Sequence, residues 1–311
     1  MGVPTFTNVM RPFLVLLQDG LEKSIRDITR DLAAHYALTA EELDVRVSSG
    51  QPQFANRVAW AKTYLKKAGL IENTRRGICR ITDLGRKALQ HRDSPFDLAF
   101  LEQFDEFRDF RYGDPGNPLV LPDQRERTGG QWDMDLVETP DEVIDRLVEQ
   151  STQALVDELL DVIKSCTPGF FERLVVKLLV QMGYGGTEQE TAAQVVGRSG
   201  DGGIDGVIKQ DPLGLDNVYI QAKRWEGSVG SPEIQKFVGA LAGRRATKGV
   251  FITTSNFTAS ARDYAHATAG FTVVLVCGEE LATLMIQHDV GVAVKSVKVM
   301  KRIDNDFFLE E

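Results

Sequence analysis

Apolar residues in the first 90 positions recur at the three- and four-residue spacing of helices that bury one face. One stripe covers residues 9–17, a second helix is predicted to open at Ser24, and a third runs over residues 53–68. Two short strands then flank the Arg-Arg-Gly turn at residues 75–77, and a short helix follows from Asp83. This order of three helices and a hairpin is typical of a winged-helix domain, which we expect over residues 1–92.

Basic side chains gather on the third helix and on the tip of the hairpin of this first domain. In a winged helix the third helix enters the major groove of DNA and the wing contacts the backbone. We therefore expect DNA contacts from five basic residues: Arg57, Lys62, Lys66, Arg75 and Arg76. The alternative is a small helical domain with a solvated basic face.

The pattern changes twice after the first domain. Residues 93–138 contain a stretch rich in proline and glycine without apolar periodicity, which predicts a linker. Residues 139–165 read as an amphipathic helix or pair of helices, which Thr139 can cap with Pro140 in the first position. From residue 166 to 300, strand-like and helical runs alternate, which predicts an α/β domain with a parallel or mixed sheet, and residues 301–311 form a tail.

The net charge of −9 is distributed unevenly along the 311 residues. Residues 1–90 hold 14 Lys+Arg against 9 Asp+Glu, residues 91–165 hold 7 against 19, and residues 166–311 hold 15 against 17. The acidic middle segment either keeps the protein soluble as a solvated linker or lies against the basic helix and wing and competes with DNA. The total charge of the chain alone therefore does not argue against a nucleic-acid partner.

Other features of the composition narrow the class of protein. No stretch approaches the length of a membrane helix, and the first residues do not read as a signal peptide, so we expect a cytoplasmic protein with no membrane partner. The three cysteines and four histidines are scattered, which argues against a disulfide framework and against a metal site built from His or Cys.

The glycine-rich stretch GRSGDGGIDG at residues 197–206 fits none of the common phosphate or calcium loops. No Lys-Ser/Thr pair follows it, as a P-loop requires, and it lacks the GxGxxG order of a dinucleotide-binding turn. Read as a calcium loop that opens at Asp201, it has Pro212 where a bidentate Glu is needed.

Polar side chains interrupt two predicted buried strands within the α/β domain. Asp205 begins one strand, while Gln221 and Lys223 share one face of the next because side chains alternate along a strand. If the two strands are neighbours, a carboxylate, an amide and an ammonium meet. Carboxylate and amide oxygens bind hard cations such as Mg²⁺, and a lysine offsets charge that develops at phosphorus. The cluster therefore has the parts for metal-assisted phosphodiester hydrolysis.

The motifs GGIDG at residues 202–206 and QAKRW at residues 221–225 resemble the Mrr family of restriction endonucleases, a branch of the PD-(D/E)xK nuclease superfamily. VPTF near the N-terminus, PEIQKFVGALAG, KGVFITTSNFT and VCGEELATLMIQHDVGV extend the resemblance over nearly the whole chain. It implies a restriction-endonuclease-like α/β catalytic domain over residues 166–300, preceded by the winged helix.

The resemblance also implies roles for individual residues. Asp205 is the metal-binding acid and Lys223 the catalytic lysine, while Gln221 occupies the position that is Glu or Asp in the wider superfamily. The Gln removes one negative charge, so metal should bind more weakly until a DNA phosphate arrives. Glu172 sits where many superfamily members have a further acid, although it also reads as a solvated helix residue. Arg224 is expected to contact a DNA phosphate.

The function implied by the resemblance is Mg²⁺-dependent cleavage of methylated double-stranded DNA, in restriction of foreign DNA. A double-strand break needs two active sites, so a homodimer or higher homo-oligomer is expected. Two alternatives stay open: a DNA repair or junction-resolving nuclease, and a reader of modified DNA that no longer cuts.

Overall fold

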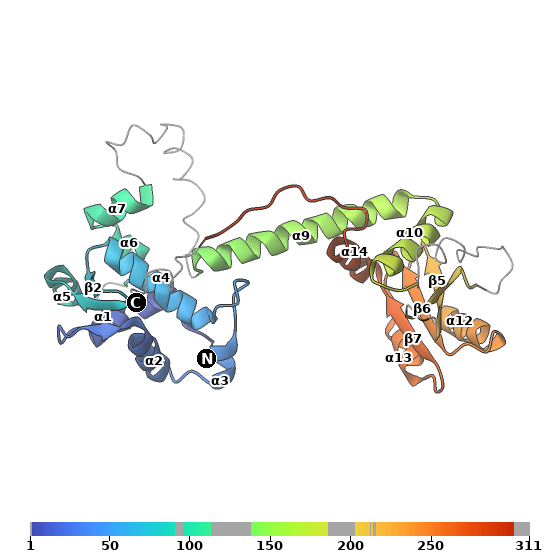
Figure 1. Ribbon diagram of the computed structural model, residues 1–311, viewed down its shortest axis with the longest axis horizontal. Coiled ribbons are helices and arrows are strands. Elements are labelled where there is room, and N and C mark those ends of the chain that lie inside the picture. The colour runs from blue at the N-terminus through green and yellow to red at the C-terminus, as the bar shows by residue number, and fades with distance from the viewer. Residues whose placement is uncertain are drawn as a thin grey trace. The chain divides into compact units, whose positions relative to one another are not determined.

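The structure is a computed structural model that describes residues 2–90, 96–112, 138–185, 203–211, 213 and 216–301. The chain divides into two compact units, residues 1–150 and 151–311 (Figure 1). Most of the expected linker over residues 93–138 lies outside the described residues, as does the expected tail apart from residue 301.

Three helices form the framework of the first unit: α1 (Phe6–Leu16), α2 (Ile25–His35) and α4 (Gln53–Lys67). Helix α1 begins three residues before the apolar stripe because Thr5 accepts a hydrogen bond from the Asn8 amide and caps it. Ser24 caps α2 in the same way, as the sequence predicts. Their inward residues, together with those of α4, form one continuous core.

A small antiparallel sheet follows these helices. Strands β2 (Ile71–Arg75) and β3 (Ile78–Ile81) form the predicted hairpin, and β1 (Lys23–Ser24) pairs with the other side of β3. Gly77 turns the chain between β2 and β3 with a positive φ of 69°, a conformation that suits glycine. The short helices α3 (Ala40–Asp44) and α5 (Asp83–Gln90) complete this part.

The segment expected to be a linker contributes to the core of the first unit, so that prediction is wrong for residues 96–112. Two short helices form there, α6 (Leu98–Leu101) and α7 (Asp105–Tyr112). Phe96, Leu101 and Phe107 are buried in the same core as α1 and α4. The two helices are too short to show the helical periodicity by which longer elements are recognised.

Residues 139–165 form a single helix, α9 (Pro140–Ser165). Thr139 caps it: the Thr139 Oγ1 accepts from the Glu142 amide, and the Glu142 carboxylate accepts from the Thr139 amide at 2.7 Å. The first turns of α9 therefore belong to the first unit.

The second unit is built on a four-stranded sheet in the order β4-β5-β6-β7. The strands are β4 (Gly206–Lys209), β5 (Asn217–Lys223), β6 (Lys248–Thr253) and β7 (Thr272–Val276). Strand β4 is antiparallel to β5, while β5, β6 and β7 are parallel, so the sheet is mixed. This confirms the predicted α/β class.

Helices cover both faces of this sheet. Helix α10 (Pro168–Gln181) and helix α14 (Gly278–Gln287) pack on the face that carries Ile220, Ala222 and Ile252. Helices α12 (Ser231–Gly243) and α13 (Ala259–Ala267) pack on the face that carries Tyr219 and Phe251. In the described part of the chain, no helix is long and apolar enough to cross a membrane.

Candidate active site and nucleic-acid interface

Asp205 stands immediately before β4, beside the middle of β5. Its backbone amide donates to the Ile220 carbonyl at 2.8 Å, and its Oδ2 accepts from the Ala222 amide at 2.7 Å. The pairing of Gly206 with Ile220 sets this position. The carboxylate is thus anchored next to Gln221, as the sequence predicts for neighbouring strands.

Gln221 and Lys223 lie on the sheet face covered by α12, while Ile220 and Ala222 point into the opposite core. Gln221 is only 6% exposed, and within the described structure its Oε1 has no hydrogen-bond partner. Gly203, with a positive φ of 94°, lets the amide approach, since a Cβ on that residue would lie 2.9 Å from the Gln221 Nε2. A buried acceptor without a donor is costly unless a ligand satisfies it.

The electrostatic setting of Asp205 favours a bound cation. Burial raises the pKa of the Asp205 carboxyl, and the negative charge of Glu172 raises this pKa further. The Ala222 amide and the Lys223 ammonium act in the opposite direction on the same pKa. A carboxylate that is desolvated near a second acid gains most from a nearby positive charge.

Glu172 lies on α10, one turn before Val176. Val176 packs against Gly206, because its Cγ2 lies 3.6 Å from the place where a Cβ of that glycine would be. The helix therefore carries Glu172 toward the start of β4, and the effect of its charge on Asp205 agrees with that position.

The residues at this edge fit a hard cation by their chemistry. Among the described residues, no group of three or more His, Cys, Asp and Glu side chains is arranged to hold a metal ion. Asp205 and Glu172 nevertheless supply carboxylate oxygens, and the buried Gln221 Oε1 supplies an amide oxygen. Oxygen ligands of these types are the ones that Mg²⁺ and Ca²⁺ prefer in proteins.

Lys223 has partners that sequence reasoning missed. Its Nζ forms an ion pair with the Glu233 carboxylate on α12 and lies 4.6 Å from the centre of the Trp225 ring. In the sequence, Glu233 belongs to the PEIQKFVGALAG motif. An acid in the first turn of a helix is explained by helix stability alone, so its position does not indicate a contact with Lys223.

Arg224 follows the last strand residue of β5 and is exposed. Its guanidinium donates to the Lys164 carbonyl at the end of α9. The Arg224 side chain is therefore held at the end of α9 and remains exposed.

The basic residues of the first unit differ in their exposure. Lys66 and Arg76 are exposed, and Arg75 is 73% exposed while paired with Glu22 at 2.8 Å. Lys62 is half-buried. The tip of the hairpin and the end of α4 are thus accessible to a partner.

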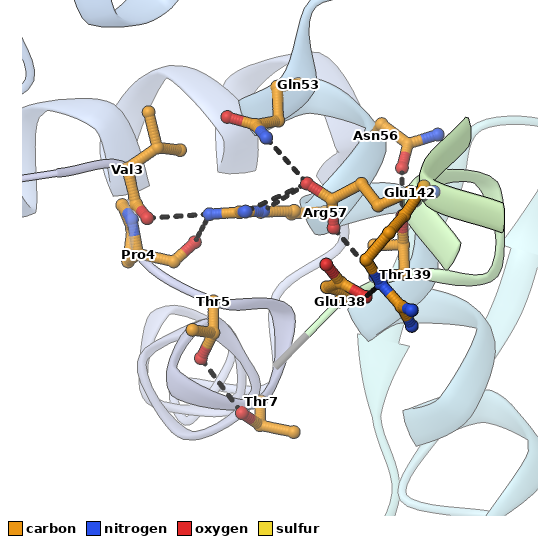
Figure 2. A network of polar contacts seen from close by, with 11 residues as sticks. Val3, Pro4, Thr5, Thr7, Gln53, Asn56, Arg57, Glu138, Thr139 and Glu142 are labelled. Carbon is orange, nitrogen blue, oxygen red and sulfur yellow. Dashed lines mark hydrogen bonds and ion pairs between the residues drawn. The ribbon is translucent and has the colours of Figure 1, made fainter. Parts of the chain in front are cut away.

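Arg57, expected to contact DNA, and the neighbouring Asn56 do not lie on an open face of α4. Arg57 is 11% exposed, and its guanidinium bonds the Glu142 carboxylate at 2.8 Å and the Val3 carbonyl at 2.6 Å (Figure 2). Asn56 is 2% exposed and accepts a hydrogen bond from the Thr139 hydroxyl at 2.8 Å. The start of α9, whose distance along the sequence hid this contact, covers both residues.

Comparison with known proteins places both units. Residues 163–285 match a family model described as "Restriction endonuclease", and residues 6–91 match one described as "Mrr N-terminal domain". The chain is 37% identical over 321 residues to the type IV methyl-directed restriction enzyme EcoKMrr of Escherichia coli (strain K12). That alignment covers 99% of this chain and 100% of the relative.

Solved structures resemble the chain more distantly. MspJI restriction endonuclease in complex with a 27-mer oligonucleotide is 19% identical, with 69% of this chain and 49% of that chain covered and a TM-score of 0.36. Restriction endonuclease FokI is 14% identical, with 91% and 70% covered and a TM-score of 0.23. Full-length identity to EcoKMrr and the two family matches therefore decide the relationship: the chain is a DNA-hydrolysing enzyme and belongs to the Mrr family of restriction endonucleases.

Proposed function

We propose that this enzyme uses Mg²⁺ to hydrolyse phosphodiester bonds of methylated double-stranded DNA, in restriction of foreign DNA in the cytoplasm. The observation that carries the proposal is the edge of β4 and β5, which brings together the Asp205 carboxylate, the Gln221 Oε1 and the Lys223 ammonium. Among the described residues, this Oε1 has no hydrogen-bond partner. The name of the E. coli relative supports methyl-directed substrate choice.

Asp205 and Gln221 would hold the cation in this proposal, and Glu172 on α10 would supply a further carboxylate. A bound Mg²⁺ would polarise the phosphoryl oxygen and acidify the attacking water. Lys223 stabilises negative charge that develops on the phosphate oxygens. Burial of Asp205 and Gln221 limits water access, which strengthens each of these electrostatic interactions.

We propose that the first unit is a winged helix that binds DNA. Its order of α1, β1, α2, α4, β2 and β3 supports this, as does the antiparallel hairpin with Arg75 and Arg76 at its tip. Lys62, Lys66, Arg75 and Arg76 would contact phosphates, and Arg57 would join them only after leaving Glu142. Arg224 would contact a phosphate near the scissile bond.

A double-strand break requires two hydrolytic sites, one for each strand. We propose that two or more copies of the chain act together on the duplex, as a homodimer or a higher homo-oligomer.

Cleavage of a plasmid methylated in vivo, compared with its unmethylated twin, tests the proposal. We expect Mg²⁺-dependent cutting of the methylated plasmid alone, and none by Asp205→Ala or Lys223→Ala variants that still bind DNA. Cutting of both plasmids would refute methylation dependence, and preferential cutting of a branched substrate would indicate a junction-resolving enzyme. DNA binding without cutting by the wild type would indicate a reader.

A further inference from the structure

The lysine of the active site is held by a carboxylate from a different element. Lys223 ends β5, and its Nζ contacts one oxygen of Glu233 in the first turn of α12. The other oxygen of Glu233 accepts from Lys236 at 2.6 Å, one turn along the same helix. The Lys223 side chain is 24% exposed and that of Glu233 is 14% exposed.

An unrestrained lysine stabilises a defined transition state poorly, because its flexible four-carbon stem places the ammonium group in many positions. Here one carboxylate oxygen fixes the ammonium, and the Trp225 ring lies 4.6 Å from it. Hydrogen bonds from Lys223 and then from Lys236 hold the pKa of Glu233 below its ordinary value. The carboxylate is therefore ionised at neutral pH and available for this contact.

We propose that Glu233 is a positioning residue, which places the Lys223 ammonium for the scissile phosphate; this inference rests on the proposed nuclease mechanism. Glu233 acts through Lys223 and does not bind the metal itself, because both of its oxygens are engaged by ammonium groups. A cation at this carboxylate would have to displace two positive charges.

The test compares Glu233→Gln and Glu233→Asp with Glu226→Gln, which removes the same charge from an exposed residue three positions after Lys223. Single-turnover cleavage rates of the methylated plasmid are measured in Mg²⁺, DNA affinity is measured in Ca²⁺, and unfolding temperatures are measured for each variant. We expect Glu233→Gln to slow cleavage about a hundredfold with unchanged DNA affinity, since small misplacements of a catalytic group cost that much. Glu233→Asp should recover part of the rate, and Glu226→Gln should cleave normally.

Two results would overturn the inference. Glu233→Gln could cleave as fast as Glu226→Gln, or it could lose rate, DNA affinity and unfolding temperature together, which would show a structural role. A wild-type enzyme that does not cleave under any of these conditions would instead refute the proposed function.

A second and independent observation concerns the start of α9 in the first unit. Its acidic side chains occupy the polar face of α4: Asp141 accepts from Asn56 at 2.6 Å and from the Trp60 indole at 3.1 Å. Glu142 accepts from Arg57 and from Gln53, and the latter bond is 2.7 Å long (Figure 2).

Asp145 extends this contact to the turn before α4, because both the amide and the hydroxyl of Ser48 donate to its carboxylate. The face of α4 and the turn before it therefore present a guanidinium, two side-chain amides, an indole, a backbone amide and a hydroxyl to three carboxylates. The same donors bind phosphate oxygens and base edges in protein–DNA complexes.

We infer that the acidic start of α9 is an internal competitor of DNA for the polar face of α4, and this inference rests on DNA binding by the first unit. Binding of a duplex through this face requires α9 to leave it. A competitor that leaves the face free for about one-tenth of the time would weaken the apparent DNA affinity about tenfold.

The test neutralises the three contacting acids in one variant, Asp141→Asn/Glu142→Gln/Asp145→Asn. A matched variant neutralises three exposed acids further along the same helix, Asp157→Asn/Glu158→Gln/Asp161→Asn. Affinity for a short fluorescein-labelled duplex is measured in Ca²⁺ at low salt, where cleavage is absent. We expect the first variant to bind about tenfold more tightly and the matched variant to bind nearly as the wild type does.

An equal gain in both variants would show that net charge alone is responsible, and would refute competition. Unchanged affinity with a lower unfolding temperature would show that the contact only stabilises the fold. Failure of every variant to bind the duplex would instead refute DNA binding by the first unit.

Discussion

Replacement of Gly203 by alanine should disturb the active site without replacing any proposed metal ligand. Gly203 has a φ of 94°, and a Cβ there would lie 2.9 Å from the Gln221 Nε2. A left-handed backbone costs an alanine about 1–2 kcal/mol. Displacing the buried Gln221 amide from its rotamer adds roughly 0.5–1.5 kcal/mol.

These two costs together come to roughly 1.5–3.5 kcal/mol. Part of this energy lowers the free energy of unfolding. The other part lowers the affinity for a cation, because the Gln221 Oε1 is displaced from the site. Every 1.4 kcal/mol lost from cation binding raises the Mg²⁺ concentration for half-maximal cleavage about tenfold.

Urea unfolding measures the loss of stability, and the Mg²⁺ dependence of cleavage measures the loss of cation affinity. Gly227→Ala is the matched control, because a Cβ on Gly227 would meet no atom of the described residues within 4 Å, in a nearby turn of the same unit. If Gly203→Ala unfolds and responds to Mg²⁺ as Gly227→Ala does, the close approach of Gln221 to Gly203 has no part in the site.

Three further predictions follow from other features. Because burial raises the pKa of Asp205 in the folded protein, ionising it costs stability, so metal-free Asp205→Asn should be more stable than the wild type at neutral pH. Urea unfolding in chelator should show that difference narrowing as the pH falls through the pKa of Asp205, and a constant difference would contradict it. Gly239 lies exposed inside α12 with open space around its Cβ position, so Gly239→Ala should stabilise the protein by about 0.5–1 kcal/mol, measured by the same unfolding assay. Neutralising Arg75 and Arg76 together should lower the slope of log affinity against log salt by about 2, whereas an unchanged slope would remove the hairpin from the DNA interface.

Short-range patterns in the sequence determined much of the architecture. The caps at Ser24 and Thr139, and the alternation along Gln221-Ala222-Lys223, depend on residues within a few positions of each other. Such signals survive without tertiary context because hydrogen bonds and side-chain direction are local properties of helices and strands. They sufficed to predict the α/β domain, while the meeting of Asp205 with Gln221 also required the pairing of β4 with β5.

Tertiary structure alone decided which partners the charged residues take. Arg57 has the spacing of an exposed helix residue, yet Glu142, 85 positions away, covers it. Glu233 reads as a helix-start acid until the packing of α12 on the sheet brings it to Lys223. Long-range ion pairs leave no period in a sequence, because they depend on how elements pack and not on how each element forms.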